Sequence, residues 1–188
     1  MGFATEELYR AKAVCNTALG KNDDAIKDYS MIIEQFHSKD ADMFRLRGEL
    51  FARQKMYPNA VKDFNKALTF KKDDVATLLA RADANIAQGK TKYIQAETDY
   101  KKVLTIESAN IRAARGLGKM YFEQEKWQFA IDNFSIAIKA GGNAEDYELR
   151  GKANFKLNNK KAACEDFTKA EQMGFPDAAK DKMNAGCK

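Results

Sequence analysis

The feature that most constrains this chain is an alanine followed four residues later by an aromatic residue, which occurs five times. The five segments run from Ala25 to Tyr29, Ala60 to Phe64, Ala96 to Tyr100, Ala130 to Phe134 and Ala163 to Phe167. Successive alanines lie 35, 36, 34 and 33 residues apart. A single unit of this length cannot bury its own apolar face and must stack on neighbouring units. The spacing therefore predicts a chain built from stacked repeats.

A second small residue precedes each of these alanines. It lies 12 residues earlier in four units, as Ala13, Gly48, Gly118 and Gly151, and 14 residues earlier in the third unit, as Ala82. Small residues on two helices let the backbones approach closely, and the aromatic residue one turn later fills the seam between units. We expect the two extra residues of the third unit in the turn between its helices, at Lys90–Tyr93, because loops absorb insertions.

Further positions recur at the same spacing and identify the repeat type. An early position in the unit is occupied by a bulky residue in four units, as Tyr9, Phe44, Leu78 and Tyr147. The position three residues before the alanine is aromatic in three units, as Tyr57, Tyr93 and Trp127. Together these residues resemble the tetratricopeptide repeat, a helix-turn-helix of about 34 residues. The resemblance covers roughly Glu6 to Phe175.

The resemblance implies an all-α fold, namely a right-handed superhelical solenoid of about five helix-turn-helix repeats with a C-terminal capping helix. We place the repeats at about 6–39, 41–74, 75–110, 111–143 and 144–175, and the capping helix at about 176–185. The capping helix is expected because the last repeat of a solenoid otherwise exposes its apolar side. We predict one domain, 1–188, since no linker or low-complexity tract divides the array.

Composition and charge narrow the kind of partner. The chain has 188 residues, of which 31% are charged, and its net charge is +5, from 32 basic and 27 acidic residues. This excess slightly favours an acidic protein or peptide partner through long-range attraction. Basic residues are scattered over all units and no recognition motif appears, so we expect no specific nucleic acid. No run approaches the 18 apolar residues of a membrane span, so we expect no membrane insertion.

The residues offer little for catalysis or for holding a cofactor or metal. The only histidine, His37, is expected at the end of a second helix, and the cysteines have no zinc or redox spacing. Aspartates recur as Asp28, Asp63, Asp99 and Asp166. Their identical place in the repeats indicates a structural or solvated helix position rather than acid–base chemistry. The sequence predicts that the chain is not an enzyme and has no cofactor.

The carboxyl end carries a second resemblance. Cys164, followed by Gly174, Ala178 and a near-terminal Cys187, is similar to the ends of many tetratricopeptide repeat proteins of bacterial envelopes. That resemblance implies a disulfide between Cys164 and Cys187; the alternative is two small apolar residues that fall near one another. Cys15 is expected to be a reduced packing residue. The expected location is periplasmic or cell-envelope if a leader has been removed, and otherwise cytoplasmic.

Tetratricopeptide repeat proteins line their concave side with the first helix of each repeat, and the small residue fixes which positions face it. The resulting partner-binding candidates are Arg10, Arg45, Glu49, Arg112, Arg115, Lys119, Phe122, Lys152 and Phe155. Arginine suits carboxylates or phosphates, and the phenylalanines offer apolar anchors; the alternative is a solvated charged face. We expect a protein–protein interaction scaffold that binds a peptide or protein in its concave groove, for which a bacterial envelope assembly is one setting. The alternative is an RNA- or phosphate-binding repeat protein. The oligomeric state is left open.

Overall fold

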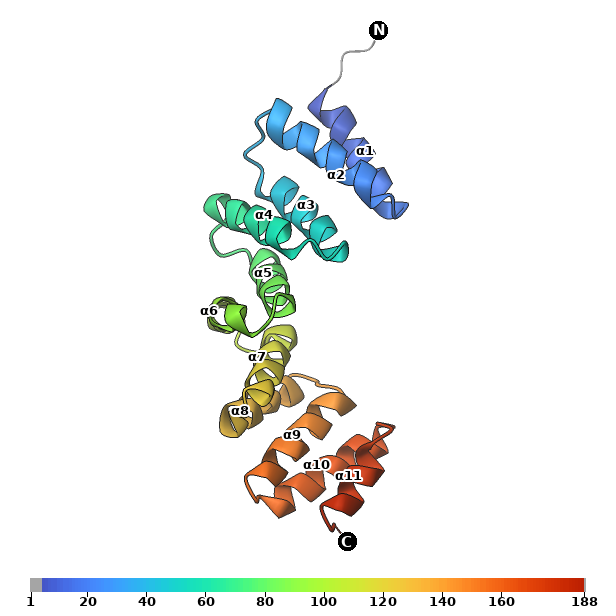
Figure 1. Cartoon of the computed structure of the whole chain (residues 1–188), viewed down its shortest axis with the longest axis vertical. Helices are drawn as coiled ribbons and strands as arrows, with labels where there is room; N and C mark the ends of the chain where they lie inside the picture. Colours follow the sequence, from blue (N-terminus) through green and yellow to red (C-terminus); the bar gives the residue numbers. More distant parts are fainter. Residues whose placement is uncertain (1–4, 188) are drawn as a thin grey trace. The chain divides into compact units, whose positions relative to one another are not determined.

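The computed structural model describes residues 5–187; residues 1–4 and 188, the ends of the predicted domain 1–188, lie outside the described part. The described residues form helices joined by turns, with no strand among them (Figure 1). In chain order the helices are α1 (Glu6–Ala18), α2 (Asn22–Ser30), α3 (Ala41–Arg53), α4 (Tyr57–Phe70), α5 (Val75–Ala87), α6 (Tyr93–Ile106), α7 (Ile111–Glu123), α8 (Trp127–Lys139), α9 (Ala144–Lys156), α10 (Lys160–Gln172) and α11 (Ala178–Asn184). The prediction of an all-α fold of five helix pairs and a terminal helix is confirmed.

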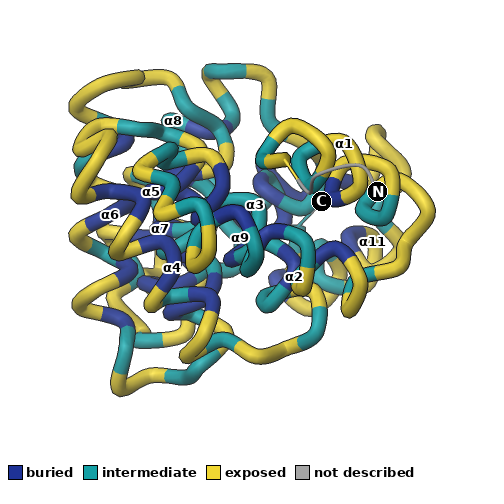
Figure 2. The backbone as a smooth tube through the Cα atoms, turned by 90° about the horizontal axis from the view of Figure 1, so that it is seen from above, coloured by how far each residue is buried: buried dark blue, intermediate teal, exposed yellow. Residues whose placement is uncertain are grey.

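Two short elements interrupt this plan. A π-helical turn, η1 (Met31–Gln35), ends the second helix of repeat one, and a 3₁₀ turn, η2 (Lys90–Lys92), lies where we expected the two extra residues of repeat three. Along the helices, buried and exposed stretches of backbone alternate, as amphipathic helices require (Figure 2).

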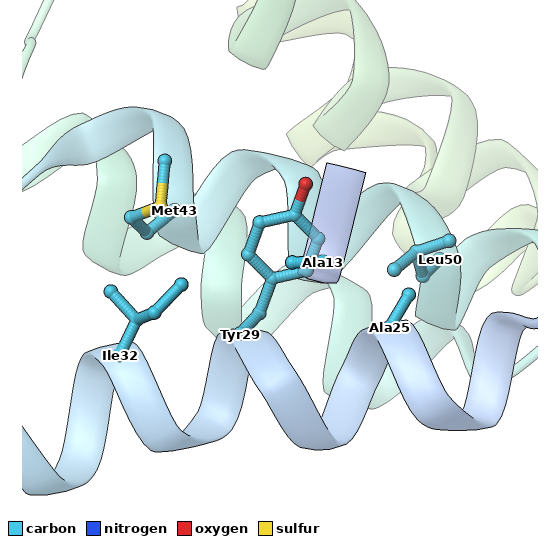
Figure 3. Packing of buried hydrophobic residues seen from close by; sticks show 6 residues of the cluster. All are labelled: Ala13, Ala25, Tyr29, Ile32, Met43 and Leu50. Atoms are coloured by element: carbon cyan, nitrogen blue, oxygen red, sulfur yellow. The ribbon is translucent and has the colours of Figure 1, made fainter. Parts of the chain in front are cut away.

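The chain divides into two compact units, Met1–Asp99 and Tyr100–Lys188, each of which is described by itself. In unit 1, Ala13, Ala25, Tyr29, Ile32, Met43 and Leu50 form one buried cluster (Figure 3). Tyr29 is the repeated aromatic residue of the first repeat, and it lies between residues of α1 and α3. Stacking of one repeat on the next therefore creates the core.

In repeats two and four, the small residue and the aromatic residue meet as the spacing predicts. A Cβ atom added to Gly48 would lie 2.7 Å from the ring of Phe64. In unit 2, a Cβ atom on Gly118 would lie 2.8 Å from the ring of Phe134. Both rings are completely buried. Glycine at these positions is thus required by close approach of the two helices of a repeat.

An arginine–aspartate pair also joins the two helices in three of the repeats. Arg47 donates to Asp63 at 2.8 and 2.9 Å, Arg81 to Asp99 at 2.8 and 2.6 Å, and Arg150 to Asp166 at 3.0 and 2.6 Å. The third nitrogen of each guanidinium reaches the second helix of the preceding repeat, at Ser30, Asn65 and Ser135 respectively. Each of these pairs therefore holds three helices, and the recurring aspartates are structural.

The last helix, α11, closes unit 2. It begins at Ala178, two residues later than expected, because Gly174, with a φ of 81°, turns the chain and the next residues continue that turn. Cys164 of α10 and Cys187 are joined by a disulfide, with Cα atoms 5.6 Å apart, and Lys182 pairs with Glu171 at 2.9 Å. Cys15 is a free thiol, as expected, but the expectation that it packs against other residues is wrong, since it is exposed.

Candidate partner-binding surface

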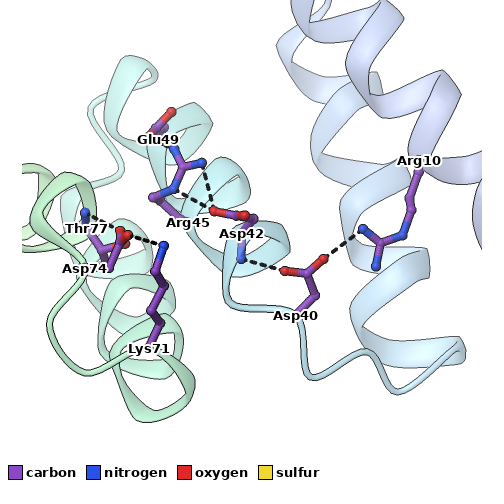
Figure 4. A network of polar contacts seen from close by, with 8 residues as sticks. All are labelled: Arg10, Asp40, Asp42, Arg45, Glu49, Lys71, Asp74 and Thr77. Carbon is purple, nitrogen blue, oxygen red and sulfur yellow. Dashed lines mark hydrogen bonds and ion pairs between the residues drawn. The ribbon is translucent and has the colours of Figure 1, made fainter.

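In unit 1, Arg10 connects α1 to the start of α3. Its guanidinium donates to Asp40 at 2.9 Å and to Glu6, one turn earlier, at 2.6 Å. Asp40 is also the N-cap of α3, where it accepts from the backbone amide of Asp42 at 3.0 Å (Figure 4). Burial acts to raise the pKa of Asp40, but the hydrogen bonds from Arg10 and from the Asp42 amide, together with the charges of Arg10 and Arg45, lower that pKa overall. Arg10 is thus held in place by the neighbouring repeat.

Two other candidates in unit 1 bind each other. Arg45 donates to Glu49 at 2.7 Å and to Asp42 at 3.0 Å, and all three residues belong to α3 (Figure 4). Beyond them, Lys71 contacts Asp74 at 2.8 Å, and Asp74 caps α5 through the amide of Thr77. The first helices of this unit therefore present a row of alternating charges rather than a purely basic face.

In unit 2, two candidates of α7 contact the first turn of α9. Arg115 donates through Nε and Nη2 to both oxygens of Asp146, each at 2.7 Å, and Lys119 donates to Glu145 at 2.8 Å. Asp146 is completely buried, and it forms a capping box with Asn143. The hydrogen bond to Asp146 is the main reason that the pKa of Arg115 is raised.

Lys152 of α9 lies between two carboxylates. Its Nζ is 3.1 Å from Glu148, one turn earlier, and 3.0 Å from Asp181 of α11. Glu148 is 0% exposed, and neither of its carboxyl oxygens accepts a hydrogen bond from any of residues 5–187. Burial, and then the neighbouring Asp181, raise the pKa of Glu148 to about 7. This cluster attaches α11 to α9 independently of the disulfide.

The remaining candidates differ in exposure. Phe122 packs edge-on against Trp127, with ring centroids 5.1 Å apart, and is half-buried. Phe155 of α9 is 42% exposed, and Arg112 of α7 is exposed. The nine predicted residues thus lie on α1, α3, α7 and α9, and in unit 2 the α7 residues Arg115 and Lys119 bind α9.

The sequence did not identify the acidic partners of these cations. They are Asp40, Asp42, Glu145, Asp146, Glu148 and Asp181. A signal was present, because most of them lie at the start of a helix, where carboxylates are favoured by the helix dipole. Acidic residues stand directly before or in the first turn of the first helix of several repeats, where a basic side chain of the preceding repeat can reach them.

The described residues hold no group of three or more histidine, cysteine, aspartate or glutamate side chains that could bind a metal ion. Within the same residues, no helix has the length and apolar character needed to cross a bilayer. What the surface offers chemically is fixed charge beside partly exposed aromatic rings, an arrangement suited to binding.

Comparison with known proteins bears on the fold. A family described as Tetratricopeptide repeat matches residues 17–76. Among solved structures, the crystal structure of MamA protein is 16% identical over 93% of this chain and 94% of that chain, with a TM-score of 0.83. A second structure, MamA 41-end from Desulfovibrio magneticus RS-1, is 20% identical over 89% and 94%, with a TM-score of 0.81.

A third similar structure is that of YrrB, described as a TPR protein with an unusual peptide-binding site. It is 16% identical over 95% of this chain and 90% of that chain, with a TM-score of 0.78. These identities establish likeness of fold alone. No curated protein matches the sequence. The family match identifies tetratricopeptide repeats within residues 17–76, and the chain shares the fold of these solved structures.

Proposed function

We propose that the chain is an interaction scaffold that binds an acidic, partly apolar segment of a protein or peptide along its first helices. Repeats of this family generally mediate protein–protein interaction and are generally not catalytic. YrrB, which has a similar fold, is described as having a peptide-binding site. The residues proposed to contact the partner remain those predicted from the repeat register.

One observation carries the proposal: the cations on these helices are held in place but not covered. Lys119 is paired with Glu145, yet its side chain is 42% exposed. Arg10 and Lys152 are similarly paired and about one third exposed. A side chain that is already ordered loses little conformational entropy when a partner binds it. Phe155, beside Lys152 on α9, adds exposed apolar area.

The test uses defined peptides rather than an unidentified partner. Fluorescence anisotropy would compare acidic octapeptides containing one leucine or phenylalanine with the same peptides after glutamate-to-glutamine exchange. We expect the acidic peptides to bind more tightly, and Phe155→Ala with Lys119→Gln to weaken them by about tenfold, the effect of a loss of about 1.4 kcal/mol. Met173→Ala, which removes a side chain of similar exposure directly after α10, is the matched control and should leave binding unchanged.

Two results would reject the proposal. The first is equal binding of the acidic and neutralised peptides. The second is tight binding of a 20-nucleotide single-stranded RNA with steep salt dependence across unrelated sequences. That result would favour the RNA- or phosphate-binding alternative.

The setting in a bacterial envelope assembly is also a proposal, supported by the Cys164–Cys187 disulfide, because such bonds persist mainly in oxidising compartments. Alkylation of the protein in intact source cells tests it. Protection of two of the three cysteines until a reductant is added would support an oxidising location, and alkylation of all three without reductant would reject it.

A further inference from the structure

A cavity of about 370 Å³ lies within unit 1, between α4, α5 and the beginning of α6. Its polar lining includes Asn65 of α4, Asn85 of α5, Lys92 of η2 and Gln95 of α6. None of these residues belongs to the predicted partner-binding set. The cavity is therefore a separate feature, and it adjoins the turn that carries the two extra residues of repeat three.

Two charged residues of the lining neutralise each other. Arg81 donates twice to Asp99, at 2.8 and 2.6 Å, and once to the side-chain oxygen of Asn65, at 2.7 Å. The carboxylate of Asp99 is thus occupied, and Asn65 keeps its amide nitrogen as a donor. Lys92 forms no ion pair with any residue in the described range 5–187, so the lining has a net positive charge.

Asn85 differs from its counterparts in other repeats. An asparagine stands three residues after the small residue in repeats one, three and five. In repeats one and five its amide nitrogen donates to the aspartate of the same repeat, Asn16 to Asp28 at 2.8 Å and Asn154 to Asp166 at 3.3 Å. Asn85 is only 3% exposed, and its oxygen accepts a long bond of 3.5 Å from Gln88. No acceptor for its amide nitrogen is found among the described residues, and the side chain lines the cavity.

We propose that this cavity binds a carboxylate group. The amide nitrogens of Asn65, Asn85 and Gln95 and the ammonium of Lys92 are donors, whereas an ionised carboxylate only accepts hydrogen bonds. Bonds from the ammonium to the carboxylate are assisted by charge and are correspondingly stronger. The ligand is an acidic side chain of a peptide or a small free carboxylic acid. This site goes beyond the proposed scaffold function, because it lies on a different set of residues.

Nuclear magnetic resonance tests the site directly, since the side-chain amide groups of asparagine and glutamine give their own signals in the ¹⁵N-labelled full chain. The probes are N-acetylaspartate N-methylamide, which carries one carboxylate, and its neutral counterpart of nearly the same shape, N-acetylasparagine N-methylamide. Glutarate serves as the free acid and inorganic phosphate as a competing anion. We expect the aspartate probe to shift the side-chain signals of Asn85 and Gln95 saturably, and the neutral probe to leave them unchanged.

The source of the carboxylate is decided by comparing the two acids. Tighter binding of the aspartate probe than of glutarate identifies a peptide side chain, and the reverse identifies a free acid; both support the site. Lys92→Gln should weaken binding by about tenfold, because it replaces a charged donor by a neutral one of roughly half the strength. Lys90→Gln is the matched control, since Lys90 lies in the same exposed turn but does not line the cavity.

A second variant, Gln95→Glu, should also weaken binding, because it places a negative charge at an exposed position of the lining. Equal shifts with the aspartate and neutral probes would overturn the proposal. So would equal affinities of the Lys92→Gln and Lys90→Gln variants, or tighter binding of phosphate than of either carboxylate.

Discussion

Repeats four and five have the same kind of contact between their two helices, here called the seam, but they differ in the charged residues beside it. In both, a glycine of the first helix lies against a phenylalanine of the second, Gly118 against Phe134 and Gly151 against Phe167. Repeat five adds the Arg150–Asp166 pair. Repeat four has neither residue of that pair: Leu117 stands in the place of the arginine and is completely buried, and Asn133 stands in the place of the aspartate.

This difference separates two kinds of repeated residue. The small residue and the aromatic residue are required wherever two helices approach closely. The ion pair can be exchanged for apolar packing, provided that both partners change together. Replacing a buried ion pair by apolar residues is often neutral, whereas removing one partner leaves an uncompensated charge. The recurring arginines and aspartates thus stabilise the array.

The largest effect is expected from the shared seam. Phe134→Ala and Phe167→Ala should each lower the free energy of unfolding by about 3–5 kcal/mol, because each removes a ring from a closely packed site. Chemical denaturation followed by circular dichroism measures both. Met173→Ala, at an exposed position, should stay within about 0.5 kcal/mol of the unchanged protein. If either phenylalanine variant lost no more free energy of unfolding than Met173→Ala, the two seams would not contribute equally to stability.

A smaller effect concerns the end of repeat five, which alone carries a disulfide. Replacing both Cys164 and Cys187 by alanine should cost roughly 3 kcal/mol, since the bond closes a loop whose chain entropy is otherwise regained on unfolding. Reductant should destabilise the unchanged protein by a similar amount and leave the double variant unaffected. Cys15→Ala is the control, and its response to reductant should match that of the unchanged protein.

The smallest effect is a dependence on pH. The pKa of Glu148 is raised from 4.5 to about 7, so its neutral form is favoured by folding. The contribution of Glu148 to the free energy of unfolding is therefore complete below pH 4.5 and is lost as the pH rises to about 7. The pKa of Asp181 is lowered from 3.8, so its ionised form is favoured by folding. Its contribution to stability is complete above pH 3.8 and is lost only as the pH falls below that value.

The Glu148→Gln variant cannot ionise at this position. Its melting temperature should therefore rise relative to that of the unchanged protein between roughly pH 5 and pH 7.5, the window set by the unfolded and folded pKa values of Glu148. Glu165→Gln, at an exposed position of α10, is the control and should show no such trend. A difference between Glu148→Gln and the unchanged protein that stays constant over this range would contradict the account of the α9–α11 contact.

The helices could be predicted because their cause is local. Each amphipathic segment follows from the spacing of the small and aromatic residues, and each of the five predicted repeat ranges contains a pair of helices. The π-helical turn Met31–Gln35 could not be predicted, since nothing in that segment departs from an ordinary helical pattern. The turn after Gly174 sets the start of α11 at Ala178, two residues after the expected position.

For the site, the register predicted which helices carry the candidates but not what those residues contact. Arg115 and Asp146 lie 31 residues apart in sequence and meet only because the next repeat stacks on α7. A signal for the structural pairs was available. An arginine directly before the small residue accompanies the aspartate in repeats two, three and five, and Leu117 accompanies Asn133 in repeat four.

A double-mutant cycle on Arg150 and Asp166 tests most directly whether the recurring charges are structural pairs. Arg150→Leu and Asp166→Asn, made singly and together, convert repeat five to the pattern of repeat four. We expect each single change to destabilise the protein by up to about 3–5 kcal/mol, and the double variant to recover most of that loss. The coupling free energy should be about 2–3 kcal/mol. A double variant as unstable as the two single changes added together would contradict the account, because the two residues would then act independently.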